Sequence, residues 1–184
     1  MASIVRRMAE HLSDGTIVLR SWRPEDADAV VDCLNGDPEI ARWLDQIPQP
    51  YTREDARVYI AGMTGNERET RFAVTGAATG RVLGSIGASW NQAGDVAEIG
   101  YWLRADARGR GVMARAVRLL VCWATAEGAA RIQLRADVEN EPSRRVAQSC
   151  GFTLEGVLRA SHWNARLGRR QDLEMYSLLP AELE

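Results

Sequence analysis

The clearest hydrophobic pattern in the chain is a helical one between Gly111 and Glu127. Apolar side chains return there at intervals of three and four residues, which brings them onto one face of an α-helix. These side chains are Met113, Ala116, Val117, Leu120 and Ala124. Gly128 follows directly, and glycine is common where a helix ends. The pattern predicts a long amphipathic helix with one face packed against a sheet.

Segments rich in β-branched and aromatic residues predict strands on both sides of this helix. Before it, Gly, Asn and Asp separate three such runs, which favours an antiparallel meander; the runs are Arg71–Thr75, Val82–Trp90 and Val96–Leu103. After it, apolar and polar residues alternate from Ile132 to Val138, the period of a half-buried strand. We also expect a strand at Thr16–Trp22 and two strands within Phe152–Leu179, joined through Asn164–Gly168.

Three shorter helices are predicted from the residues that begin them. Pro24 and the acidic residues after it suit a first helical turn, whereas Thr52 and Asn140 are good N-terminal caps. The helices are expected at 24–34, 52–62 and 140–151. The order of strands, helix, strand, helix and strands predicts a mixed α/β (α+β) fold better than a regular βαβ winding.

Size, composition and charge narrow the function classes. The chain has 184 residues, so we expect one domain over residues 1–184, with a loosely held lead-in at 1–14. The formal net charge is -2 and like charges form no block, which argues against nucleic-acid binding. No run approaches the roughly 20 apolar residues of a membrane span, and the first residues lack the apolar core of a secretory signal. We expect a cytoplasmic protein.

The cysteines suggest neither a disulfide framework nor a metal site. Cys33, Cys122 and Cys150 are odd in number, far apart in the chain and form no CxxC pair. We expect no metal, and we expect each cysteine to be a small buried apolar residue.

The segment Arg108–Ala114, RGRGVMA, carries the candidate chemistry, and it lies between a predicted strand and the long helix. Its two glycines allow the backbone to approach a ligand closely, and the free amides and dipole of a helix start favour an anion. Arg108 and Arg110 could add charge-assisted contacts to phosphates. A tight strand-to-helix turn with solvated arginines is the simpler alternative.

Two well-known phosphate loops are excluded for this segment. A Walker A loop needs Lys followed by Ser or Thr after its second glycine, and a dinucleotide fingerprint needs a third glycine and βαβ order. The sequence has neither feature. The pyrophosphate of coenzyme A is the anion that remains.

The longer segment Glu98–Ala114, EIGYWLRADARGRGVMA, resembles the pyrophosphate-binding motif of GNAT acetyltransferases, Gln/Arg-x-x-Gly-x-Gly/Ala. Arg108 and Gly111 match it. Met113 departs from the last small-residue position, and this departure is similar to the RimJ/RimL-like branch, which acetylates ribosomal-protein N-termini. A second segment, Val138–Gly156 (VENEPSRRVAQSCGFTLEG), is also similar to that branch.

This resemblance extends from about Thr16 to Leu179 and implies the GNAT acyl-CoA N-acyltransferase fold. In that fold, helices flank a mostly antiparallel central sheet with one splayed pair of parallel strands, here Val96–Leu103 and Arg131–Val138. The implied reaction transfers an acetyl group from acetyl-CoA to a primary amine, with a protein N-terminal α-amine as the expected acceptor. The amine would attack directly through a tetrahedral intermediate, without an acyl-enzyme.

The resemblance also implies the residues of the site. Those expected to bind acetyl-CoA are Leu103, Arg108, Gly109, Arg110, Gly111, Val112, Met113 and Asn140. Ser143 matches a serine proposed to protonate or hydrogen-bond the departing thiolate. For Asn140 and Ser143, helix capping is the alternative explanation.

The acceptor amine must lose a proton, and the sequence offers two candidates for the general base besides water. Glu98 is an acidic residue in a strand that otherwise resembles a buried one, although pairing with an arginine would explain it equally well. His162 stands where the RimJ/RimL-like branch carries a glutamate thought to act as the base, and an ordinary half-exposed histidine is its alternative. We leave this choice open.

The sequence also leaves open the acceptor, the oligomeric state and whether the chain is catalytic. The acceptor could be an aminoglycoside, a polyamine or an aminoacyl nucleotide, or the chain could bind acetyl-CoA without catalysis. A homodimer is possible by resemblance alone. Four aromatic residues could line an acceptor cleft, but aromatic residues more often belong to a core, so we leave them out of the site; they are Trp43, Trp90, Tyr101 and Trp163.

Overall fold

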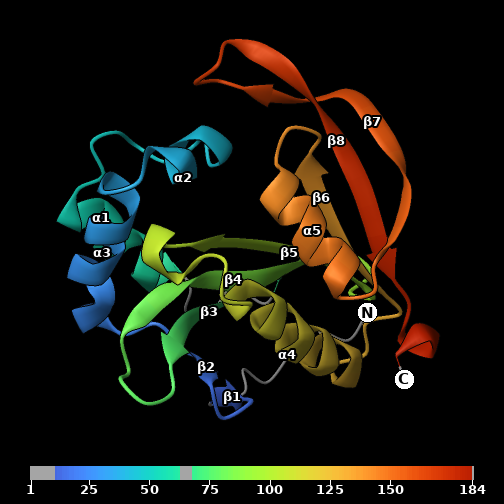
Figure 1. Ribbon diagram of the computed structural model, residues 1–184, viewed down its shortest axis with the longest axis horizontal. Coiled ribbons are helices and arrows are strands. Elements are labelled where there is room, and N and C mark those ends of the chain that lie inside the picture. The colour runs from blue at the N-terminus through green and yellow to red at the C-terminus, as the bar shows by residue number, and fades with distance from the viewer. Residues whose placement is uncertain (1–10, 63–67, 184) are drawn as a thin grey trace.

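The computed structural model of the protein describes residues 11–62 and 68–183. The described strands form one mixed sheet in the order β1-β2-β3-β4-β5-β6-β8-β7, and within it β5 and β6 are the one parallel pair (Figure 1). The strands are β1 (His11–Ser13), β2 (Ile17–Arg20), β3 (Glu69–Gly76), β4 (Val82–Trp90), β5 (Val96–Leu103), β6 (Arg131–Asp137), β7 (Thr153–Asn164) and β8 (Arg169–Leu178). The helices are α1 (Ala27–Asn35), α2 (Pro38–Trp43), α3 (Arg53–Gly62), α4 (Val112–Ala126) and α5 (Glu141–Ser149). The predicted mixed, mostly antiparallel sheet flanked by helices is confirmed.

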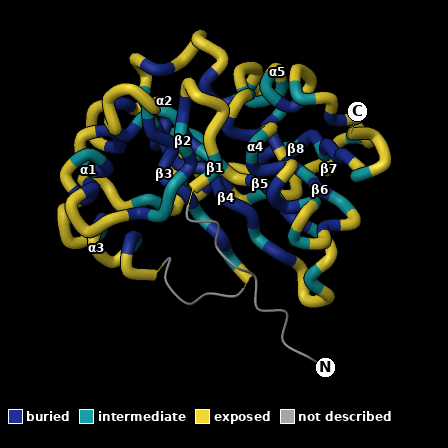
Figure 2. The backbone as a smooth tube through the Cα atoms, turned by 90° about the horizontal axis from the view of Figure 1, so that it is seen from below, coloured by how far each residue is buried: buried dark blue, intermediate teal, exposed yellow. Residues whose placement is uncertain are grey.

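Helices cover both faces of this sheet, and each face has its own hydrophobic core. α4 and α5 pack on one face, where Phe72 and Leu120 are fully buried. α1 and α3 pack on the other face, around Val30 and Ala56. Neighbouring residues of one strand serve different cores, because Phe72 belongs to the first and Ala73 to the second. Figure 2 shows the buried residues gathered along the central strands and the exposed ones on the outer loops.

Most of the predicted elements are confirmed, and two elements have no counterpart in the prediction. β4 and β5 have the predicted bounds, and α4 is shorter than predicted by one residue at each end. β1 pairs with β2, so part of the expected lead-in is held in the sheet, while residues 1–10 lie outside the described residues. α2 is too short to show a helical period; it begins at Pro38, with Asp37 accepting a hydrogen bond from the amide of Glu39 at 3.0 Å.

The parallel pair separates before its strands end. β5 and β6 pair from Val96 opposite Arg131 to Ile99 opposite Leu134. Beyond Ile99, β5 continues to Leu103 along β4, and β6 continues beside β8. The two strands thus part in the middle of the sheet, and the predicted splay is present.

The cysteines differ in how far they are buried, and the helices can be compared in length and hydropathy with a membrane span. The three cysteines are free; Cys33 is buried, as expected, whereas Cys150 is only partly buried against the core on the α4 side. The expectation is wrong for Cys122, which is exposed because it lies on the side of α4 that faces away from the core. Within the described residues, no helix is both long enough and apolar enough to cross a membrane.

A buried ion pair joins the end of β2 to the turn before α1. Arg20 donates two hydrogen bonds to Asp26, at 2.7 and 2.8 Å, and the amide of Arg23 donates a third at 2.9 Å. Burial by itself raises the pKa of the Asp26 carboxyl, but these hydrogen bonds and the charge of Arg20 outweigh it. The pKa therefore lies below its ordinary value of 3.8 in the folded protein.

Asp26→Asn should lower the free energy of unfolding at neutral pH by about 3 kcal/mol, because it leaves a largely buried Arg20 without its counter-charge. Folding lowers the pKa of this carboxyl, so its contribution is complete above the unfolded value of about 4 and is lost as the pH falls further. The difference between the two proteins in urea unfolding should shrink from about pH 5 to about pH 2.

Asp28→Asn is the matched control, because Asp28 pairs with Arg53 at the surface. This change should cost less than about 1 kcal/mol. Equal losses in the two variants, or a loss in Asp26→Asn that does not change with pH, would contradict the role of the buried pair.

Candidate functional site

Two adjoining cavities open where β5 and β6 separate. The first, the groove, has a volume of about 530 Å³ and lies against the first turn of α4. The second, the chamber, has a volume of about 730 Å³ and lies between the sheet, the segment after α2 and the β7–β8 hairpin. The residues that line both cavities are Trp43, Leu44, Tyr101, Trp102, Asn140 and Ser143. The groove and the chamber therefore form one continuous cleft.

The groove ends at a backbone cradle formed by the start of α4. Gly109 and Gly111 both have a φ of 71°, a left-handed conformation that glycine adopts without strain. A side-chain carbon built on either residue would meet no atom within 4 Å, so the space beside them is open. The amides of the first helical turn point out of the helix without intrahelical acceptors, and the helix dipole adds positive potential there. This geometry suits a pyrophosphate group.

The structure brings most of the predicted cofactor-binding residues to this groove. Those that line it are Leu103, Arg108, Gly109, Gly111, Val112, Met113 and Asn140. The side chains of Val112 and Met113 are buried in the core. Arg110 is exposed and does not line the groove.

Arg108 has a structural partner that the sequence did not indicate. Its guanidinium donates to the carbonyl of Leu103 at 2.9 and 3.1 Å and forms an ion pair with Asp37, the N-cap of α2. Asp37 lies 71 residues away in the chain. In this arrangement Arg108 fastens the loop before α4 to α2, and its side chain is committed to protein partners.

Ser143 lies where the groove meets the chamber, and its hydroxyl is paired with a tyrosine. The Ser143 Oγ and the Tyr101 hydroxyl are 2.9 Å apart. Asn140 caps α5 by accepting a hydrogen bond from the amide of Ser143 at 3.2 Å, so the capping role belongs to Asn140. Burial raises the pKa of the Tyr101 phenol, although the hydrogen bond with Ser143 lowers it. Tyr101 therefore stays protonated at neutral pH and can donate to Ser143.

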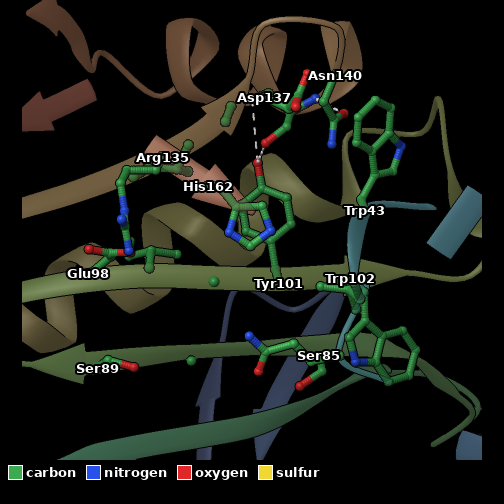
Figure 3. A pocket seen from close by; sticks show the side chains of 18 of the residues that line it. Trp43, Ser85, Ser89, Glu98, Tyr101, Trp102, Arg135, Asp137, Asn140 and His162 are labelled. Carbon is green, nitrogen blue, oxygen red and sulfur yellow. Dashed lines mark hydrogen bonds and ion pairs between the residues drawn. The ribbon is translucent and has the colours of Figure 1, made fainter. Parts of the chain in front are cut away.

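Glu98 lies on the floor of the chamber and is fully engaged with neighbouring side chains (Figure 3). One carboxylate oxygen accepts two hydrogen bonds from Arg135, at 2.6 and 2.8 Å. The other accepts one from Gln133 at 2.8 Å. The arrangement is the arginine pair that the sequence left open as an alternative to a general base.

His162 reaches the chamber from the β7–β8 hairpin, which curves toward α2 in Figure 1. Its Nε2 lies 3.3 Å from Asp45 Oδ1, although Asp45 is 117 residues away in the chain. Asp45 Oδ2 also accepts a hydrogen bond from the backbone amide of Ala165 at 2.8 Å, so the carboxylate is held in place. The hairpin and the segment after α2 are thus joined directly above the chamber.

Several residues that line the chamber were not predicted from the sequence. Trp43 and Tyr101 do line the cleft, whereas Trp90 packs edge to face on Trp123 in the core, and Trp163 is 54% exposed outside both cavities. Polar residues that line the chamber and were not predicted for the site include Asp45, Ser85, Asp137 and Gln171. Strand alternation would have placed the last two on a polar face, but no pattern in the sequence shows that they share a cavity.

Comparison with known proteins gives a consistent family. A family model described as the acetyltransferase (GNAT) domain matches residues 16–153. An uncharacterized N-acetyltransferase, p20, from Bacillus licheniformis is 30% identical to this chain, and the alignment covers 94% of this chain and 98% of the relative. YdaF, a putative ribosomal N-acetyltransferase from Bacillus subtilis (strain 168), is 29% identical, with 91% and 93% covered.

Solved structures agree with this family at the level of the fold. RimL, a ribosomal α-N-protein acetyltransferase solved in complex with coenzyme A, has a TM-score of 0.80 to this chain at 22% identity. The alignment covers 91% of this chain and 96% of RimL. The family match extends over most of the chain, and a relative at 30% identity extends over nearly all of it. The chain therefore belongs to the GNAT acetyltransferase family, and it is an acetyl-CoA-dependent N-acetyltransferase.

Proposed function

We propose that the protein acetylates the N-terminal α-amine of a protein or peptide, with acetyl-CoA in the groove and the amine in the chamber. The observation that carries the proposal is the continuous cleft, which joins a backbone anion cradle to a polar chamber at the Tyr101–Ser143 pair. The relative named as a putative ribosomal N-acetyltransferase and the likeness to the RimL fold support the same acceptor class.

Different parts of the groove suit the pyrophosphate and the pantetheine arm of coenzyme A. The cradle at Gly109 and Gly111 offers backbone donors to the pyrophosphate. The groove is also lined by apolar Ile40, Leu103 and Val146, which suit the pantetheine arm. Arg108 then acts as a brace of the cradle through Asp37, and we assign the phosphate contacts to the backbone.

His162 is our choice for the general base. When Nε2 carries the ring hydrogen and donates it to Asp45, the lone pair of Nδ1 is free to accept a proton from the amine. A carboxylate that orients a catalytic histidine is a common arrangement, because it fixes both the tautomer and the direction of the ring. Glu98 has no comparable freedom, since Arg135 and Gln133 hold both its oxygens.

Ser143 and Tyr101 are suited to the departing thiolate. If the Tyr101 hydroxyl donates to Ser143 Oγ, then the hydroxyl hydrogen of Ser143 can point to the sulfur. Ser143 and Tyr101 would then stabilise the leaving group, while His162 deprotonates the amine in the chamber. The amine attacks the thioester carbonyl directly, and no cysteine of the chain is needed for the transfer.

A panel of acceptors tests the proposed function. Purified protein and acetyl-CoA should release free thiol with peptides that carry a free N-terminus, with a higher kcat/KM than with polyamines, aminoglycosides or aminoacyl nucleotide analogues. Mass spectrometry should locate the acetyl group on the α-amine, and N-formylated copies of the same peptides should be inert. Binding of acetyl-CoA without turnover of any acceptor would instead identify a non-catalytic binding module.

Gly111→Asp should weaken the binding of coenzyme A by about tenfold or more in calorimetry, because the side chain would project a negative charge into the open space beside the cradle. Gly80→Asp is a matched control. Gly80 has a nearly equal φ of 66° and open surroundings, but it lies in the β3–β4 turn outside both cavities. Equal affinities of the two variants would show that backbone strain, rather than the pyrophosphate, accounts for any loss.

His162→Ala should lower kcat by about a hundredfold or more, the usual contribution of a general base, and leave the affinity for coenzyme A nearly unchanged. The other histidine, His11, is exposed on β1, so His11→Ala supplies the control with normal kinetics. Unchanged turnover in His162→Ala would transfer the role to water or to Glu98.

A further inference from the structure

Two buried polar side chains in the chamber each have one atom that lacks a hydrogen-bond partner among the described residues. Asp137 is 8% exposed and Gln171 is 4% exposed. The unpartnered atoms are Asp137 Oδ2 and Gln171 Nε2, and both residues line the chamber. The other oxygen of Asp137 accepts the amide of Glu139 at 2.7 Å, which fixes the orientation of the carboxylate.

Unsatisfied buried groups of this kind are costly, and native proteins keep few of them. Both residues line the chamber, where the proposed function places the acceptor. A ligand that hydrogen-bonds to both would remove the cost. We therefore treat them as binding groups for the acceptor.

The register of the sheet places these two residues on one face and close together. Asp137 on β6 lies opposite Leu173 on β8, and Gln171 is two residues from Leu173 on the same strand. Such diagonal neighbours have their Cβ atoms about 7–8 Å apart. On the other side of β8, Gln171 lies opposite His162 of β7. His162, Gln171 and Asp137 thus form a row across three neighbouring strands, and Figure 3 shows the two outer members around the chamber.

The chemistry of the pair defines a class of acceptor. An ionised Asp137 carboxylate accepts hydrogen bonds at Oδ2 and cannot donate one, whereas Gln171 Nε2 donates and cannot accept. The complementary ligand presents an N–H donor and an oxygen acceptor a few atoms apart. A peptide N-terminus has this arrangement in its first residue, whereas a polyamine has donors alone.

We propose that Asp137 and Gln171 bind the first residue of a peptide acceptor, with Asp137 accepting a hydrogen bond from the α-amine and Gln171 donating to the first carbonyl oxygen. The proposal rests on the proposed function and deepens it. It explains why the chamber would select an α-amine followed by a carbonyl group. An amine nitrogen carries enough hydrogens to contact Asp137 and still lose a proton to His162.

The first experiment compares two acceptors in two proteins. The acceptors are alanyl-alanyl-alanine amide and its analogue in which a trans alkene replaces the first peptide bond, so that the carbonyl oxygen is missing. The wild-type protein should prefer the amide by about tenfold in kcat/KM, the size of one buried hydrogen bond. Gln171→Met keeps the length of the side chain but removes the donor, and should abolish this preference by lowering the value for the amide alone. An equal effect on both acceptors, or none, would overturn the proposal for Gln171.

Gln133→Met is the matched control for this change. Gln133 lies on the same sheet face, but its amide already donates to Glu98. The preference for the amide over the alkene should survive in this variant. Loss of the preference in Gln133→Met as well would show a general disturbance of the sheet and would count against the proposal.

Asp137→Asn tests the other half of the pair. It retains an oxygen for the Glu139 amide and replaces the second oxygen with a donor. The change should lower kcat/KM for both acceptors alike, by about tenfold or more, because both carry the α-amine. A normal value for either acceptor would overturn the assignment of Asp137.

Failure of this inference can be distinguished from failure of the proposed function. Absence of turnover with every acceptor would refute the function, and calorimetry with the two peptide compounds and the protein saturated with coenzyme A would then decide the inference. Tighter binding of the amide than of the alkene by the wild-type protein, lost in Gln171→Met, would support it. Equal binding of the two compounds by the wild-type protein would overturn it.

Discussion

The end of hydrogen-bonded pairing between β5 and β6 beyond Ile99 is the constraint on which the rest of the structure depends. A continuous sheet would bury the ends of both strands and leave no passage between its faces. Because the strands part, Tyr101 on β5 reaches Ser143 on α5, which lies on the far side of the gap. The groove on the α4 side and the chamber on the other side meet at this point.

Other contacts keep the gap open and its edges rigid. On the β5 side, Arg108 joins the carbonyl of Leu103 to Asp37 and so fixes the end of the strand relative to α2. On the β6 side, Arg144 of α5 donates to Glu174 of β8 at 2.7 Å, and the hydroxyl of Tyr176 donates to the same carboxylate. Burial by itself raises the pKa of the Glu174 carboxyl, but these two hydrogen bonds outweigh burial and bring the pKa below its ordinary value. The carboxylate therefore stays charged and holds α5 to the sheet.

The parts of this structure that the sequence predicts are those in which the information is local. The period of α4 and the alternation of β6 are visible within a dozen residues, because each element buries one face of its own. The cradle is equally local, since Gly109, Gly111 and the first turn of α4 are consecutive. Short helices such as α2 are missed by sequence-based prediction, because an N-cap and a proline are weak signals where the helix is too short to show a hydrophobic period.

The chamber is the opposite case, and this difference explains why the reaction class is easier to infer than the acceptor. His162 pairs with Asp45, which is 117 residues away, and the pairing of β6 with β8 brings Asp137 near Gln171. None of these partners can be recognised before the sheet is assembled. Under the proposed function, the acceptor is thus selected by residues whose spacing in the chain carries no motif.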